Sequence, residues 1–293
     1  MEYIYLCNTA ADSISKVNAD KLLEENRIML NKNEGRLGPH SFCFYKSKMY
    51  IANSYGNKIS IVDIRKSREI DSIYIGCHCN DIAIYNDKAY LACGDLNSIL
   101  VLDIASRKIL ETIPAGNLPH NIDIYKDKMV VSNMGDDTVS LINLKDGKNI
   151  KNIRVGPYPT KAKFTSDGST ILVCESNIGS YKNGGLAFVD VKKKKILFRI
   201  NLGSAPIDLF CSKSNCYVSN LGDGTVSIIK LDCFKESKRI DICSMPRGIM
   251  KKGKYLYVGD NYRNELIRYD LLSEKIKKVQ TGREPTSMIL LAN

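Results

Sequence analysis

A repeat of about 40 residues is the feature that most constrains the fold of this 293-residue chain. Glycines that close successive units stand at Gly76, Gly116 and Gly156, each 40 residues after the last, and Gly203 follows after one longer interval. A period of this length indicates a repeat architecture, in which each unit buries its faces against neighbours of its own kind. The same place in the remaining units is held by Gly38, Cys243 and Gly282.

The unit between Gly116 and Gly156 contains four short runs of the kind that form strands: NIDIY, KMVVSN, TVSLINL and NIKNIRVG. Each run is rich in β-branched residues and is bounded by turn residues such as Gly135-Asp136-Asp137. This pattern predicts a four-stranded antiparallel meander.

The two ends of the chain complete one another. The last unit has only its first strand, TSMILLAN, whereas Met1 begins in the middle of a unit with EYIYLCNTAADSISKV. A closed ring joins them and removes the exposed sheet edges. We therefore predict an all-β fold, a seven-bladed β-propeller in one domain, whose last blade combines the C-terminal inner strand with three N-terminal strands. The predicted blades are 39–76, 77–116, 117–156, 157–203, 204–243, 244–282, and 283–293 plus 1–38.

Four strand pairs carry a resemblance to a known family: YIANSYGNKISIVDI, VVSNMGDDTVSLINL, YVSNLGDGTVSIIKL and YLCNTAADSISKV. With the turn that follows each, they resemble the YVTN-repeat (YncE-like) propellers over the whole chain. The resemblance implies the fold but not an activity, because propellers serve as binding surfaces, scaffolds and enzymes.

Strand direction predicts one functional face, because the first strand of each blade starts where the second strand ends. Asparagine is the usual residue at the end of the second strand, where its side chain holds the neighbouring loop. The starts of the first strands align as His40, Asn80, His120, Thr160, Ile207, Arg247 and Thr286. The ends of the second strands align as Asn53, Cys93, Asn133, Glu175, Asn220, Asp260 and Asn8.

All three histidines of the chain fall on this face, in three consecutive blades. Imidazole, thiolate and carboxylate groups are the ligands of zinc, iron or copper. We predict a metal or small-ligand site at the channel mouth, with His40, His78, His120, Cys93 and Glu175 as metal ligands. The alternative is that these histidines only make hydrogen bonds across loops at a wet channel mouth.

If the site is catalytic, His40 and His120 are the expected ligands or general bases, since imidazole titrates near neutral pH. Glu175 would then be a carboxylate ligand or acid/base partner. Tyr181 lies in a long loop that either covers the mouth or is a tolerated surface insertion. The further expected ligand-binding residues are His78, Asn80, Thr160, Arg247, Asp260, Thr286 and Tyr181. The sequence does not decide whether the protein is an enzyme.

The net charge is +11, and lysines gather in turns expected on the opposite face, for example Lys46, Lys48 and Lys192 to Lys195. A basic face can hold nucleic acid or an acidic partner. Against nucleic acid, the runs contain little aromatic interleaving for base stacking. A scaffold for protein or nucleic-acid partners is therefore the alternative function.

Several signatures are absent from the sequence. It has no phosphate-binding glycine loop, G-x-S-x-G or H-E-x-x-H motif, so no nucleotide cofactor is expected. No apolar stretch is long enough to cross a bilayer, and the first residues are spent on strands rather than on a signal peptide. We expect a cytoplasmic protein without membrane partners, whose ten cysteines are reduced.

Overall fold

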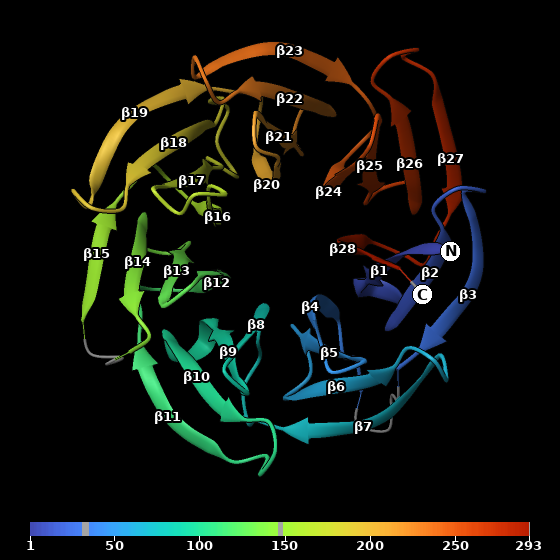
Figure 1. Ribbon diagram of the computed structural model, residues 1–293, viewed down its shortest axis with the longest axis vertical. Helices are drawn as coiled ribbons and strands as arrows, with labels where there is room; N and C mark the ends of the chain where they lie inside the picture. The colour runs from blue at the N-terminus through green and yellow to red at the C-terminus, as the bar shows by residue number, and fades with distance from the viewer. Residues whose placement is uncertain (31–34, 146–148, 293) are drawn as a thin grey trace.

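The computed structural model describes residues 1–30, 35–145 and 149–292; positions 31–34, 146–148 and 293 lie outside the description. Seven four-stranded antiparallel sheets follow one another in a ring (Figure 1), and their inner strands line a central channel. The predicted all-β, seven-bladed propeller is therefore confirmed.

Every blade runs from an inner strand at the channel to an outer strand at the rim (Figure 1). The inner strands are β4 (Pro39–Tyr45), β8 (Asp81–Tyr85), β12 (Pro119–Tyr125), β16 (Pro159–Phe164), β20 (Pro206–Cys211), β24 (Pro246–Lys252) and β28 (Pro285–Ala292). The second strands are β5 (Lys48–Asn53), β9 (Lys88–Cys93), β13 (Lys128–Asn133), β17 (Thr170–Glu175), β21 (Asn215–Asn220), β25 (Tyr255–Asp260) and β1 (Glu2–Asn8). The third strands are β6 (Lys58–Asp63), β10 (Ser98–Asp103), β14 (Thr138–Asn143), β18 (Gly185–Asp190), β22 (Thr225–Lys230), β26 (Glu265–Asp270) and β2 (Ser13–Asn18). The outer strands are β7 (Arg68–Tyr74), β11 (Ile109–Pro114), β15 (Ile150–Arg154), β19 (Lys195–Asn201), β23 (Lys235–Asp241), β27 (Ile276–Gln280) and β3 (Leu23–Met29).

Helical structure is limited to two short 3₁₀ turns in the described residues, η1 (Thr9–Ala11) and η2 (Gly94–Leu96). Within that part of the chain, no helix has the length and hydropathy that a membrane span requires.

The ring closes as the sequence predicts. The C-terminal strand β28 is the inner strand of a sheet whose other members are β1, β2 and β3. Its pairing with β1 is antiparallel, with Ile4 opposite Leu290 and Leu6 opposite Met288. Both chain ends therefore lie in one blade (Figure 1), and their pairing satisfies backbone groups that an open ring would expose.

The core lies between blades rather than inside any one of them. The described residues form seven clusters of buried apolar side chains, and each cluster joins two adjacent sheets. In one, Ile14 of β2 packs with Met49 of β5 and Val62 of β6. A single meander could not bury these side chains, so hydrophobic burial binds each blade to the next.

The inner strands are irregular at the channel mouth. In β4, β12, β16 and β20 the register with the second strand shifts by one residue just after the first proline, which leaves His40, His120, Thr160 and Ile207 unpaired. A β-bulge of this kind re-aims the side chain of the extra residue. The bulges therefore explain why these side chains face the channel.

Candidate functional site

The residues that start the inner strands meet around one cavity at the mouth of the channel. Its volume is about 40 Å³, enough for a few water molecules or a very small ligand. It is lined by His40, Asn80, His120, Thr160, Ile207, Arg247 and Thr286, together with the residue that follows each in the chain. All seven blades thus contribute a side chain to the same small space.

His40 is held from both sides by hydrogen bonds. Its Nδ1 lies 2.8 Å from the carbonyl oxygen of Asn80, and its Nε2 lies 2.9 Å from Nη2 of Arg247. A carbonyl only accepts and a guanidinium only donates, so Nδ1 of His40 carries the proton and Nε2 accepts from Arg247. The imidazole is therefore neutral, and both ring nitrogens are occupied by protein groups.

Among the described residues, one ring nitrogen of His120 has a hydrogen-bond partner. Its Nδ1 lies 2.9 Å from the carbonyl oxygen of Thr160, so Nδ1 donates the proton of the neutral ring. The ring meets that of His40 edge to face, with centroids 5.2 Å apart. The Nε2 of neutral His120 is left as a hydrogen-bond acceptor beside the cavity.

Burial shapes the charge at the mouth. Desolvation lowers the pKa of His120 to about 4 and holds the pKa of His40 well below its usual range, with the Arg247 cation lowering both further. Desolvation also lowers the pKa of Arg247, but a guanidinium stays charged at neutral pH. The mouth therefore combines one fixed cation with two neutral imidazoles.

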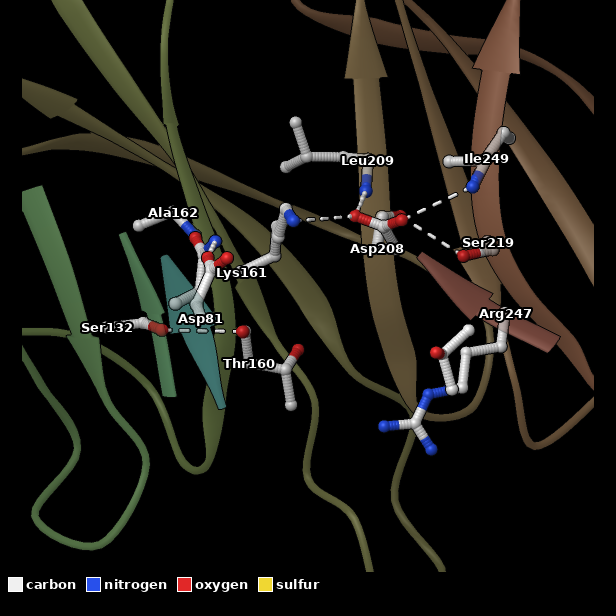
Figure 2. Close-up of polar contacts among 12 residues, drawn as sticks. Asp81, Ser132, Thr160, Lys161, Ala162, Asp208, Leu209, Ser219, Arg247 and Ile249 are labelled. Atoms are coloured by element: carbon white, nitrogen blue, oxygen red, sulfur yellow. Dashed lines mark hydrogen bonds and ion pairs between the residues drawn. The ribbon is translucent and has the colours of Figure 1, made fainter. Parts of the chain in front are cut away.

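Deeper in the channel a second polar layer was not anticipated from the sequence. Nζ of Lys161 lies 3.4 Å from Oδ1 of Asp208 (Figure 2). Burial alone lowers the pKa of Lys161, but the carboxylates of Asp208 and Asp81 outweigh it and raise that pKa above its ordinary value. The residues that follow the mouth residues, apart from Gly248, line this deeper part of the channel, so aligning that slot as well would have found the layer.

The second layer also joins the blades. Oδ2 of Asp81 accepts from the backbone nitrogen of Ile122 at 2.9 Å, and Oδ2 of Asp208 accepts from Ile249 at 3.2 Å (Figure 2 shows the latter). Oδ1 of Asn121 accepts from the nitrogen of Ala162 at 2.9 Å. These side chains hold neighbouring inner strands together, so several of their hydrogen-bond acceptors are already occupied by backbone nitrogens.

The ends of the second strands lie inside the blades, one strand away from the channel. Asn133 is fully buried, and its amide donates to Oγ1 of Thr138 at 2.9 Å and Oγ of Ser140 at 2.8 Å. Glu175 takes this place in its own blade. Its Oε1 accepts from the nitrogen of Gly156 at 2.7 Å and from Nε of Arg199 at 2.9 Å.

Asp260 in the equivalent place accepts from the backbone nitrogens of Ser244, at 3.0 Å, and Met245, at 3.3 Å. Neither Glu175 nor Asp260 lines the mouth cavity. Each carboxylate binds backbone nitrogens of the loop that leads into its blade.

Two other expected site residues point to solvent. His78 is about half exposed, and its Nδ1 lies 2.9 Å from Oδ2 of Asp95. Tyr181 is fully exposed and does not line the mouth cavity.

The five predicted metal ligands, His40, His78, His120, Cys93 and Glu175, therefore do not converge. Within the described chain, no three of these five share a potential metal centre. Two of these residues end second strands and His78 lies on a loop outside the channel, which keeps the five side chains apart.

Three cysteines do converge. The Sγ atoms of Cys77 and Cys93 are 3.1 Å apart, those of Cys79 and Cys93 are 2.7 Å apart, and those of Cys77 and Cys79 are 3.9 Å apart. All three are buried. Hydrogen bonding with the other two thiols lowers the pKa of Cys77 to about 4, because a thiolate there is stabilised by neighbouring S–H groups. This cluster could hold a metal ion.

Some lysines expected on the basic face are paired. Nζ of Lys46 lies 2.9 Å from Asp87 of the next blade, and Nζ of Lys254 lies 2.8 Å from Asp270. Lys252 forms an ion pair with Glu2. An exposed pair such as Lys46 with Asp87 stabilises the fold little, but all three pairs reduce the positive charge offered to a polyanion.

Comparison with known proteins identifies the class of protein. No family model and no curated protein matches the sequence. Among solved structures, a functionally unknown protein from Desulfotomaculum acetoxidans is 15% identical, with a TM-score of 0.80 over 98% of each chain. A protein from Lactobacillus plantarum is 16% identical, with a TM-score of 0.74 over the full length of both chains. The Kuenenia stuttgartiensis hydrazine synthase is 19% identical, with a TM-score of 0.70 over 88% of this chain and 90% of that chain.

At these identities the likeness concerns the fold alone. The protein is a seven-bladed β-propeller that resembles other propellers of the same size, and its function has to be argued from its own residues.

Proposed function

We propose that this protein is a YVTN-type propeller that binds a small oxyanion, a carboxylate or phosphate group, at the channel mouth. The proposal rests on the position of the charged Arg247 side chain and on its hydrogen-bond partner. Its guanidinium lies at the mouth cavity, and its described hydrogen bond goes to a neutral imidazole rather than to a carboxylate.

A charged guanidinium without a carboxylate partner is suited to an anion. In the described part of the chain, Arg247 takes part in no ion pair closer than 4.0 Å, whereas Lys161 is paired with Asp208. Figure 2 shows the guanidinium of Arg247 pointing away from the Asp208 carboxylate. Guanidinium groups bind carboxylate and phosphate through parallel N–H···O bonds, and Arg247 has donors left for them.

His120 determines which second hydrogen-bonding group the ligand should carry. Its Nε2, to which no described residue donates, is an acceptor while the ring is neutral, so it would accept from a hydroxyl or protonated oxygen of the ligand. If the ring gains a proton, the same nitrogen becomes a donor to the anion. The cavity of about 40 Å³ limits the ligand at the mouth to a few non-hydrogen atoms or to the end group of a larger molecule.

The proposal places the protein in the cytoplasm and assigns no metal to the mouth. All ten cysteines are free, as a reducing compartment would keep them. The channel imidazoles have one or both ring nitrogens bound to protein groups, which leaves too few ligands there for a metal.

The alternative proposal, a scaffold for protein or nucleic-acid partners, is supported by the net charge of +11 and by exposed lysines such as Lys192 and Lys193. Filter binding across salt concentrations distinguishes it, because phosphate contacts weaken steeply as salt rises. A steep salt dependence with tight binding at low salt would favour the scaffold.

Isothermal titration with acetate, inorganic phosphate and sulfate tests the oxyanion site. We expect one of these probes to bind with one-to-one stoichiometry, and Arg247→Gln to weaken that binding at least about tenfold. Arg263→Gln is the matched control, since Arg263 is an exposed arginine of the same blade. Failure of all three probes to bind, or equal affinity in Arg247→Gln, would overturn the proposal.

The variant Glu175→Gln distinguishes a role in anion binding at the mouth from a role in stabilising the blade. This variant weakens the contacts to Gly156 and Arg199, so the free energy of unfolding should fall by about 1–3 kcal/mol. The affinity for the anion should be unchanged, because Glu175 does not line the cavity. A loss of anion affinity without a loss of stability would show that Glu175 contributes to the binding site.

A further inference from the structure

The thiol cluster of Cys77, Cys79 and Cys93 occupies a place where the repeat pattern of the propeller is broken. In the other six blades a proline that starts the inner strand lies opposite an amide or acid that ends the second strand. The six pairs are Pro39 with Asn53, Pro119 with Asn133, Pro159 with Glu175, Pro206 with Asn220, Pro246 with Asp260, and Pro285 with Asn8.

Only the blade 77–116 replaces both members of this pair with cysteine. Cys79 stands two residues before Asp81 in the inner strand, as Pro119 stands two residues before Asn121. Cys93 ends the second strand, in the place of Asn133. A third cysteine, Cys77, replaces the residue two positions earlier and brings its sulfur to the same point.

The turn itself does not require these three cysteines. Asn133 hydrogen-bonds two hydroxyl groups of its own blade, which a thiol does less well. The remaining blades show that proline and asparagine suffice to build the turn. Three sulfurs brought together by three separate departures from the repeat therefore point to a use for sulfur itself.

We propose that Cys77, Cys79 and Cys93 form a three-thiolate site for a thiophilic metal ion, Zn²⁺ or Cu⁺. Soft thiolate ligands select these ions over hard cations, which prefer oxygen. Binding replaces the S–H bonds of the cluster with metal–sulfur bonds and releases the protons to solvent, and no electron is transferred. The site lies on the loop before β8 and at the end of β9, apart from the channel mouth.

The geometry is close to that of such a centre. Metal–sulfur bonds of about 2.3 Å in a trigonal arrangement place the sulfurs about 4 Å apart. The separation between Cys77 and Cys79, 3.9 Å, already has this value. The pairs that include Cys93 are shorter, at 3.1 and 2.7 Å, so its sulfur must move away from the others by about 1 Å when the ion enters.

The neighbourhood favours an ion with few ligands. The three sulfurs belong to a core cluster whose other members are apolar, including Ile75, Ile82 and Leu100. Cys77 is the most accessible of the three, with 5% of its surface exposed, so an ion would enter from its side.

The test uses the reduced full chain, stripped of metal and handled without oxygen. Zn²⁺ and Cu⁺ are each titrated in competition with a coloured chelator, and native mass spectrometry counts the ions per chain. We expect one ion per chain, bound at least 100-fold more tightly than by the double variant Cys79→Pro/Cys93→Asn. That variant restores the residues found in blades such as 117–156, so it should fold, which circular dichroism checks.

Cys211→Val is the matched control. In the described chain, Cys211 and Cys216 form a pair of thiols 3.2 Å apart that no third potential ligand joins, so removing one should leave the bound ion unchanged. Equal metal binding by wild type and by the folded double variant would overturn the proposal. So would absence of uptake by the reduced chain, or a Cys79–Cys93 disulfide as the only chemistry found in protein isolated without oxygen.

Discussion

Arg247 donates a hydrogen bond across the channel mouth to His40, at 2.9 Å between Nη2 and Nε2, although 207 residues separate the two in the chain. The contact exists because ring closure sets the inner strands β24 and β4 around the same cavity. It links the fixed cation of the mouth to a histidine whose other nitrogen is held by Asn80. The protonation state of His40 therefore depends on Arg247.

Replacing Arg247 should raise the pKa of His40. The largest cause of its low pKa is burial, and the guanidinium is the next. In Arg247→Gln the cation is gone while a polar side chain remains, so His40 should titrate at higher pH than in the wild type. NMR titration of the imidazole Cε1–H resonances measures this, with His40→Gln to assign the signal. An unchanged His40 titration in Arg247→Gln would contradict the prediction.

Stability should fall as the pH drops from 7 towards 4.5. The folded pKa of His120 is about 4, below the ordinary value of 6.5, so between these values the unfolded chain binds more protons than the folded chain. The stability that neutral His120 contributes is fully present above pH 6.5 and is lost as the pH falls from 6.5 to 4. At pH 5 the loss is at most about 2 kcal/mol for this histidine, and His40 acts in the same direction.

Urea unfolding at pH 7 and pH 5 checks this pH dependence. Carboxylates with lowered pKa, such as Asp167 at about 2, lose their contribution only at lower pH and do not confuse the comparison. His120→Asn copies the residue that Asn80 supplies in the neighbouring blade. The variant should lose less stability between the two pH values than the wild type does. Parallel losses in both proteins would show that His120 does not titrate in this window.

The fold could be predicted from the sequence because each strand repeats at a fixed interval. The closing glycines and the incomplete units at both ends determine the number of blades and the pairing of β28 with β1. The mouth residues could be aligned for the same reason. His40, His120 and Arg247 occupy one slot of the repeat, and in a closed ring one slot occupies one level of the channel.

The rest of the site depends on features that the repeat does not encode. Glu175 shares a face with the mouth residues, but it ends a second strand and its carboxylate turns into the blade towards Arg199. His78 lies only two residues from Asn80, yet it is on a loop that faces solvent. The convergence of Cys77 with Cys79 and Cys93 depends on side-chain directions to within an ångström or two, which spacing in a sequence does not determine.

Gly248 should tolerate a side chain far less well than Gly253 of the same hairpin. Both have positive φ, at +70° and +54°, so replacing either with alanine should lower the free energy of unfolding by about 1–2 kcal/mol through backbone strain. A Cβ at Gly253 would meet nothing within 4 Å, whereas one at Gly248 would lie 1.8 Å from the carbonyl oxygen of Thr286 on the closing strand. Because backbone on β28 must move, Gly248→Ala should cost about 2 kcal/mol more than Gly253→Ala in the free energy of unfolding. Thermal or urea unfolding of the two variants provides the comparison. Equal losses in the free energy of unfolding would mean that β28 moves away from the new side chain at little cost, which would contradict the prediction.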